Sequence, residues 1–388
     1  MVQKTLDAKL AKMLSEPASG EFILADAKDA DMAFGISAPG ASPEHHAAEG
    51  RFRSLQEYRN LIRENVCQGL IDIMLMSAST NEVLTIQERL FDDSPVTPAI
   101  RANDTTDIWL AQGGAYSQEP SQPFRSASID IAMCGKAECH PDERCRGADL
   151  GLYSVTFNND VTTDHRTLEE YRRFREEAAA KGFRHFLELF DPNAPLAPIP
   201  DIGRFMNDMT VRALAGVAAE SRPVFLKVVY HGPAAMEQLA AYDSGLVVGI
   251  MGGSSGTTFD AFHQLWEARK YGARAALYGR MINGAEHQAS FIRHLRALAD
   301  GQVQPAEAVR SYHSDLAKEK ISAHRPLEED LQSIARFGAY SGSGTPVTGS
   351  AMVCGAKDNP QDSTPDFSKM TNAEKIAWNR ARWKRILG

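Results

Sequence analysis

Residues 223–231 read PVFLKVVYH, a short apolar and β-branched run that ends in polar residues and precedes a helical pattern. The same arrangement recurs along the chain, and most of the runs are followed by an amphipathic stretch. The eight runs begin near Glu21, Leu70, Val96, Leu150, Phe183, Pro223, Leu246 and Ala273. Apolar residues recur at helical spacing over 55–66, 168–181, 208–220, 234–242, 258–271 and 285–299.

This alternation decides the fold class. Strands that are apolar on both faces need cover on both faces, and parallel neighbours need crossover helices. Eight such units predict an α/β fold, a (β/α)8 TIM barrel with its active site at the carboxyl ends of the strands. The first run is not followed by G-x-G-x-x-G, which disfavours an open dinucleotide-binding sheet. We expect the barrel to occupy residues 1–301, with a long insertion at 103–147 after the third strand, and a helical C-terminal extension at 302–388.

The composition of the chain limits the classes of protein to which it can belong. The chain has 388 residues, 43% hydrophobic and 24% charged, and a formal net charge of −8. These values are typical of a globular protein and disfavour nucleic-acid binding through bulk charge. No stretch approaches the roughly 20 apolar residues of a membrane helix, and the five cysteines are an odd number that favours reduced thiols. We therefore expect a cytoplasmic protein with no membrane or nucleic-acid partner, and a homo-oligomer.

One lysine stands inside an otherwise apolar strand. Lys227 lies in the sixth run, and burial there would lower the pKa of its amine and make it nucleophilic near neutral pH. The structural alternative is a strand lysine that pairs with a carboxylate or extends to water. We expect Lys227 to be catalytic because the following two strands carry a second signal.

That second signal is a pair of glycine-containing strand ends. The seventh run ends in Gly252, Gly253 and Ser254, and the eighth in Gly279 and Arg280. In a barrel, the loops after strands seven and eight commonly bind phosphate, because glycines let backbone amides approach the anion and an arginine clamps it. Turns also need glycine for conformational reasons alone. The order of these features along the chain nevertheless favours a phosphate site.

Further charged residues follow other strands. Asp26 and Lys28 follow the first run, and period-two alternation points both to one side of the strand, which in a barrel could be the interior of the mouth. Glu188 is enclosed by apolar residues, so it is either paired with a cation or raised in pKa. Arg101 follows the third run and is a candidate substrate-binding residue or a helix cap. A solvated charged turn is the alternative for Asp26 and Lys28.

The order of these features resembles the class I, Schiff-base-forming aldolases of the deoxyribose-phosphate aldolase and archaeal-type fructose-bisphosphate aldolase group, over about residues 20–298. The residues that match the family's functional positions are Asp26, Lys227, Gly252 with Gly253, and Gly279 with Arg280. The resemblance implies a Schiff base on Lys227, proton transfer by Asp26 with Lys28 or Glu188, and a phosphorylated sugar or keto substrate. It implies no metal and no cofactor.

Two departures keep alternatives open. The fructose-bisphosphate aldolases of this type place a tyrosine near the end of strand four, where this chain reads Thr156-Phe157-Asn158, so the proton donor is not assigned. Asp26-x-Lys28-x-x-Asp31 also resembles the D-x-K-x-x-D signature of the orotidine-phosphate decarboxylase group. The alternative function is a metal-independent decarboxylase or isomerase of a phosphosugar that uses these three residues.

Two other segments suggest further functions, a structural zinc site and a binding or packing helix. Cys134, Cys139, His140 and Cys145 contain enough soft ligands for a structural zinc, although they lack the tight C-x2-C pairs of most zinc sites. The basic helix expected over 372–388 could bind nucleic acid or an acidic partner, but such a helix more commonly packs its tryptophans on its own barrel or a neighbouring subunit.

Overall fold

The computed structural model describes residues 2–42, 52–109, 111, 113–253, 256–334 and 371. The chain divides into two compact units, Met1–Gly40 with Phe52–Pro346, and Ala41–Arg51 with Val347–Gly388. The account below concerns the first unit, because only Ala41, Ser42 and Thr371 of the second are described. The basic helix expected over 372–388 lies outside the described residues.

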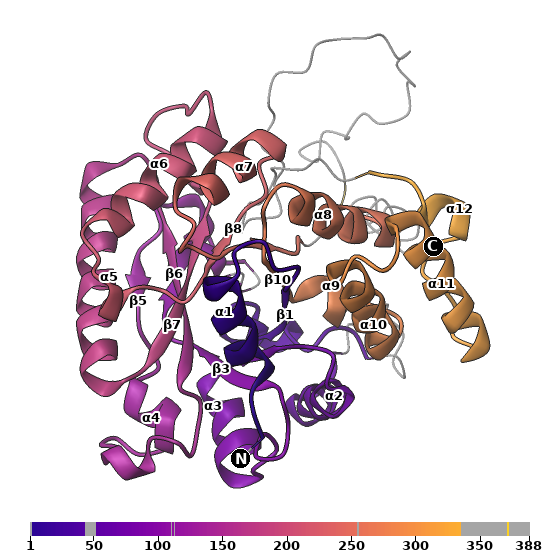
Figure 1. The fold of residues 1–388 in the computed structure, drawn as a ribbon, viewed down its shortest axis with the longest axis horizontal. Coiled ribbons are helices and arrows are strands. Elements are labelled where there is room, and N and C mark those ends of the chain that lie inside the picture. The colour runs from indigo at the N-terminus through magenta and orange to yellow at the C-terminus, as the bar shows by residue number, and fades with distance from the viewer. Residues whose placement is uncertain are drawn as a thin grey trace. The chain divides into compact units, whose positions relative to one another are not determined.

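The first unit contains a closed barrel of parallel strands surrounded by helices (Figure 1). Each of the eight apolar runs forms one barrel strand, so the TIM-barrel prediction is confirmed. The barrel strands are β1 (Ile23–Lys28), β2 (Ile73–Met76), β3 (Thr97–Arg101), β6 (Leu150–Thr156), β7 (Arg184–Phe190), β8 (Leu226–Val228), β9 (Val248–Met251) and β10 (Ala275–Tyr278). The barrel closes between β1 and β10, where Ile23 pairs with Ala275.

The helices lie mainly where amphipathic patterns predict them. They are α1 (Thr5–Ser15), α2 (Leu55–Gln68), α3 (Ala78–Asn81), α4 (Ile129–Cys134), α5 (Val161–Lys181), α6 (Ile202–Ala215), α7 (Pro233–Tyr242), α8 (Thr258–Lys270), α9 (Arg280–Asn283), α10 (Gln288–Ala299), α11 (Pro305–Lys318) and α12 (Leu327–Asp330). The bounds predicted for α6, 208–220, are wrong. Asp201 caps that helix by accepting a hydrogen bond from the Arg204 amide, and the helix ends at Ala215. None of the described helices is long and apolar enough to cross a membrane.

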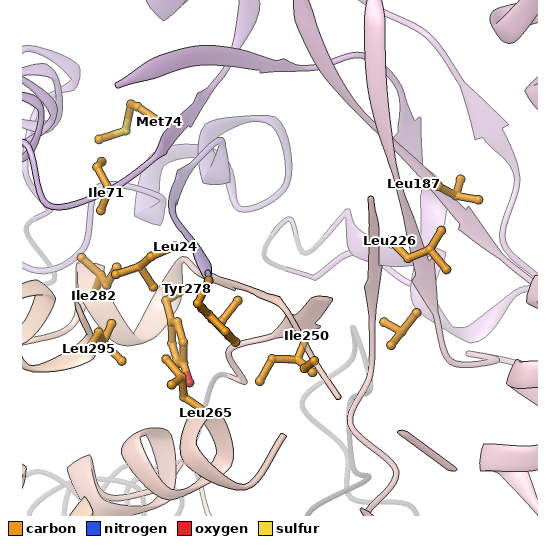
Figure 2. Packing of buried hydrophobic residues seen from close by; sticks show 14 of the residues in the cluster. Leu24, Ile71, Met74, Leu187, Leu226, Ile250, Leu265, Tyr278, Ile282 and Leu295 are labelled. Carbon is orange, nitrogen blue, oxygen red and sulfur yellow. The ribbon is translucent and has the colours of Figure 1, made fainter. Parts of the chain in front are cut away.

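Period-two alternation along each strand separates two apolar layers. Residues such as Ile23, Ala25 and Leu75 face the lumen of the barrel, where Leu6 and Met13 of α1 join them. The other strand residues face the surrounding helices, and Figure 2 shows this outer layer. Its labelled members are Leu24, Ile71, Met74, Leu187, Leu226, Ile250, Leu265, Tyr278, Ile282 and Leu295. The face on which a strand residue lies therefore determines whether it reaches the lumen or the helix layer.

The long connection between β3 and β6 is not a simple crossover. It contains a small antiparallel hairpin, β4 (Asp104–Thr105) with β5 (Pro123–Phe124), and then α4. Asn193, in the loop after β7, donates hydrogen bonds to the carbonyls of Ser117 and Glu119 and so ties the insertion to the mouth of the barrel. At the other end of the unit, α11 packs against α8 and α10.

Candidate active site

At the carboxyl ends of the strands, the lumen changes from apolar to charged. The side chains that interact there belong to five different strands or strand ends: Asp29 after β1, Arg101 on β3, Ser154 on β6, Glu188 on β7 and Lys227 on β8. Each follows a lumen-facing apolar residue of the same strand at a spacing of two positions. The fold therefore brings together residues that are almost 200 positions apart in the sequence.

Lys227 is paired with Glu188 inside the barrel. The Lys227 Nζ lies 2.5 Å from Glu188 Oε1, and the two residues are register partners on neighbouring strands. The other carboxylate oxygen, Oε2, accepts a hydrogen bond of 2.6 Å from Ser154 Oγ. The Lys227 side chain is 9% exposed and that of Glu188 is 1% exposed. A buried amine and a buried carboxylate are thus in direct contact.

Arg101 extends this contact into a chain of alternating charges. Its Nε donates to Asp29 Oδ2 at 2.6 Å, one terminal nitrogen donates to Ser154 Oγ, and the other lies 3.6 Å from Glu188 Oε2. Burial alone would lower the pKa of Arg101, but the charges of Asp29 and Glu188 outweigh burial and hold that pKa above its ordinary value. The guanidinium therefore stays charged and compensates the two carboxylates.

The environment expected for Lys227 needs a correction. The sequence led us to expect an amine in apolar surroundings that is uncharged for that reason. In the structure Nζ contacts the Glu188 carboxylate, so its nearest partner is a charged group and not an apolar one. A lysine ammonium must pass a proton to a base before it can act as a nucleophile, and Glu188 is the base within reach.

The direction expected for Asp26 and Lys28 is wrong. The two side chains do lie on one side of β1, but that side faces the helix layer. Lys28 Nζ donates to both Asp26 oxygens, at 2.8 and 2.9 Å, and Asp26 Oδ2 accepts from Asn65 of α2. Asn65 in turn donates to Gln288 of α10. Because Leu24, on the same face of the strand, belongs to the outer apolar layer, the residues at alternate positions from it cannot enter the lumen.

The residue of this segment that does reach the lumen network is Asp29, which we had not selected. Asp29 is separated by even numbers of positions from Ala25 and Ala27, which the structure places in the lumen, so it lies on the same face of the strand. Burial is the largest of several influences on Lys28 and lowers the pKa of its amine, which remains fully enclosed with Asp26.

Asp31, the third residue of the alternative decarboxylase motif, has a different partner. Its Oδ2 accepts a hydrogen bond of 2.6 Å from Ser77 Oγ, beyond the end of β2. Burial raises the pKa of the Asp31 carboxyl, with Ser77 acting in the opposite direction. Asp26, Lys28 and Asp31 are thus divided between the helix layer and the strand ends.

At the strand ends expected to bind phosphate, the backbone conformation and packing require glycine. A Cβ on Gly252 would lie 2.2 Å from the Tyr278 ring, and Gly253 has a φ of +63°. A Cβ on Gly279 would lie 3.0 Å from the Ala27 carbonyl oxygen. The Arg280 guanidinium stands over the Phe34 ring, 5.8 Å from its centroid. Ser254 lies outside the described residues, and phosphate binding by these loops stays a prediction.

A further carboxyl group, Asp107, reaches the mouth from the insertion. Its oxygens accept hydrogen bonds from Ser121 Oγ at 2.8 Å and from Thr156 Oγ1 at 3.0 Å. Burial raises the pKa of Asp107, and the hydroxyl donors oppose that rise. Sequence reasoning missed this residue because it lies outside the barrel strands, and nothing in its local pattern indicates a contact with β6.

The structure does not support the zinc hypothesis. Within the described ranges, no group of three or more His, Cys, Asp or Glu side chains is placed to hold a metal ion. Cys134 is buried at the end of α4, whereas Cys145 is exposed and contacts the Asp142 carbonyl. Cys134, Cys139, His140 and Cys145 therefore do not form a shared ligand set.

Known proteins were compared with this chain at three levels. No family model matches the sequence, and no curated protein matches it. Solved structures do match. An archaeal fructose 1,6-bisphosphate aldolase is 15% identical with a TM-score of 0.54, and the match covers 76% of this chain and 99% of that one.

Two further solved structures have the same fold. One is an archaeal fructose-1,6-bisphosphate aldolase with its catalytic lysine bound to the carbinolamine intermediate of the substrate, 17% identical, with a TM-score of 0.54 over 76% of this chain and 100% of that one. The other is the fructose-bisphosphate aldolase from Slackia heliotrinireducens, 13% identical, with a TM-score of 0.56 over 81% and 92%. At these identities the likeness establishes the barrel fold that this chain shares with them.

Proposed function

We propose that this protein is a class I aldolase-like lyase that forms a Schiff base on Lys227. The observation that carries the proposal is the contact between Lys227 and Glu188 inside the barrel, at the carboxyl ends of the strands where barrel enzymes place their active sites. An amine next to a carboxylate, enclosed and isolated from bulk water, has what imine formation requires: a nucleophile and a group that moves protons.

The reaction follows from these two side chains. Glu188 takes a proton from the Lys227 ammonium, and the free amine adds to a carbonyl carbon. The carbonyl oxygen then takes up one proton from the amine nitrogen and the proton held by Glu188, and it leaves as water, so Glu188 is ionised again. A C–N double bond replaces the C–O double bond, which gives a cationic iminium. The ionised Glu188 then accepts the proton of a substrate hydroxyl, the adjacent C–C bond breaks, and its electron pair neutralises the iminium.

Ser154 and Arg101 have supporting roles in this proposal. Ser154 donates to the Glu188 oxygen that does not contact the amine, so it fixes the orientation of the carboxylate. Arg101 maintains positive charge beside the same oxygen while Lys227 changes its own charge. Asp29 balances the charge of Arg101 from the opposite side.

The substrate in this proposal is a phosphorylated sugar or keto compound. Gly252, Gly253, Gly279 and Arg280 follow β9 and β10, the last two barrel strands, and their position there favours a phosphate at the mouth of the barrel, away from the reacting carbon. Binding energy from that end would hold the scissile bond near Lys227. Two of the fold relatives are archaeal aldolases that act on fructose 1,6-bisphosphate, which makes phosphosugars the first compounds to test.

Reductive trapping tests the proposal. The protein is incubated with borohydride and a panel of phosphosugars and simple carbonyl compounds, then digested and analysed by peptide mass spectrometry. We expect a reduced adduct on the peptide that contains Lys227, and none when substrate is omitted. Failure of every compound to label Lys227, with the protein folded by circular dichroism, would contradict the proposal.

A further inference from the structure

One layer of the lumen above Lys227 is apolar on one side of the barrel. We call this layer the apolar roof, and its members are Ile108, Phe190, Val229 and Met251. All four are at least 92% buried, and they form a cluster separate from the two main apolar layers. The roof consists of three strand-end residues and one residue of the insertion.

The register of the strands places this roof directly above the reacting amine. Glu188 pairs with Lys227, and Lys227 pairs with Gly249, so these three residues form one level of the barrel. Phe190 and Val229 each lie two positions beyond a member of that level, and Met251 lies two positions beyond Gly249. Residues two apart on a strand point to the same face, so the roof is the next level toward the mouth.

The wall of the mouth next to the roof, over β6 and β3, is polar. Thr156 is the register partner of Phe190, and its hydroxyl donates to Asp107. Below it, Ser154 and Arg101 face the lumen. A carbonyl carbon bonded to Lys227 has two substituents, and these two walls offer them different surroundings. A substituent on the β6 side would meet hydrogen-bonding groups, whereas one on the roof side would meet side chains without hydrogen-bonding atoms, apart from the thioether sulfur of Met251.

We propose that the apolar roof makes this site specific for ketones in which one of the two carbons flanking the carbonyl carries no hydroxyl group. The inference rests on the proposed Schiff-base function and specifies its substrate class. A hydroxyl under the roof loses its hydrogen bonds to water and gains none, which is unfavourable, whereas an alkyl group of equal size gains contact with Phe190, Val229 and Met251. The hydroxyl that drives cleavage belongs on the polar side.

Two ketones of almost equal size test this inference. 1-Hydroxybutan-2-one and 1,3-dihydroxyacetone share one CH2OH group and differ in a terminal CH3 against OH. Each is incubated with the full-length protein and borohydride, which supplies the hydride that reduces the iminium after water has left. The ketone concentration that gives half-maximal labelling of Lys227 is measured by mass spectrometry. Labelling of N-α-acetyl-lysine under the same conditions corrects for the intrinsic reactivity of each ketone.

After this correction, we expect the concentration of 1-hydroxybutan-2-one that gives half-maximal labelling to be lower than that of dihydroxyacetone by a factor of about ten or more. The variant Met251→Gln, which offers a polar side chain of similar size, should reduce that preference at least threefold. Its matched control, Met251→Leu, keeps the roof apolar and should retain the preference.

The outcomes separate this inference from the proposed function. Labelling of Lys227 by both ketones with equal efficiency, or with dihydroxyacetone preferred, would overturn the specificity of the roof and leave the Schiff-base function standing. Equal changes of the preference in Met251→Gln and Met251→Leu would also overturn the specificity of the roof and leave the Schiff-base function standing. If no carbonyl compound labels Lys227, the proposed function fails and the inference fails with it.

Discussion

Strand β1 and its end contribute charged groups to two different regions of the molecule. In the helix layer, Lys28 and Asp26 bind each other, with Asn65 as the further partner of the carboxylate. In the lumen, Asp29 begins a chain that runs through Arg101 and Glu188 to Lys227. Both regions contain a buried lysine in contact with a buried carboxylate.

The difference between these regions lies in what surrounds each pair. Lys28 donates to both oxygens of one carboxylate and is fully enclosed, so the pair is closed within the helix layer. Lys227 contacts one oxygen of Glu188, and its side chain retains 9% exposure at the level where the strands open to the mouth. Burial and an ion pair alone therefore do not indicate a reactive lysine, because the face of the strand determines access to substrate.

Replacing Lys227 should have the largest effect on Schiff-base formation and so distinguish the lumen lysine from the lysine of the helix layer. In Lys227→Met the nucleophile is lost, so Schiff-base trapping should fall by about a thousandfold or more while the far-ultraviolet circular dichroism stays native. The measurement is the mass of the intact protein after borohydride treatment with a ketone that labels the wild type. Equal labelling of this variant, with the adduct found on Lys28, would show that the wrong lysine had been chosen.

Removing the base should slow labelling without abolishing it. In Glu188→Gln the proton acceptor of Lys227 becomes an amide, and we expect adduct formation to slow by roughly 10²-fold to 10⁴-fold near neutral pH, with partial recovery at higher pH. The rate is followed by timed borohydride quenches. Glu177→Gln, which changes a carboxylate of α5 that pairs with Arg125 outside the lumen, is the matched control. A rate loss of similar size in both variants would argue against a specific role for Glu188.

The closed pair in the helix layer should contribute to stability instead. Lys28→Met leaves Asp26 buried without its cation, and we expect the free energy of unfolding to fall by about 3–5 kcal/mol. Asp26→Leu with Lys28→Met removes both charges and should recover most of that loss. Urea denaturation compares the three proteins. A single variant as stable as the double one would show that Asp26 finds another partner or is neutral.

Acid should lower the stability of the fold through His185, which lies in the helix layer. This residue lies on β7, three positions before Glu188, and its ring contacts Tyr171 Oη at 2.9 Å. Burial lowers its pKa to about 3. Since the unfolded chain binds a proton below about pH 6.5 and the folded chain does not, stability should fall as pH drops from 6.5 toward 3, by about 2 kcal/mol at pH 5. His185→Gln should flatten that dependence in urea titrations at each pH, and an unchanged slope would assign the acid sensitivity to other groups.

The sequence indicated the barrel because its information is local and repeated. Each apolar run and each amphipathic stretch predicts one element, and eight units of this kind have few alternatives to closure. Lys227 was found for the same reason, since a single charge inside an apolar strand is visible without knowledge of its neighbours. Asp107 and Ser154 were not found, because their importance depends on contacts with distant residues and their local patterns are ordinary.

The amino-acid sequence by itself determined the eight strands, their order and the presence of a lysine within the sixth. Only the tertiary structure decided which side of each strand faces the lumen, and hence that Asp29 and not Asp26 joins Arg101. The physical reason is that a shift of one residue in a strand moves a side chain from the lumen to the helix layer, and a charged strand end does not reveal that register. Closure of the barrel fixes it, because the apolar residues of all eight strands must fill the same interior together.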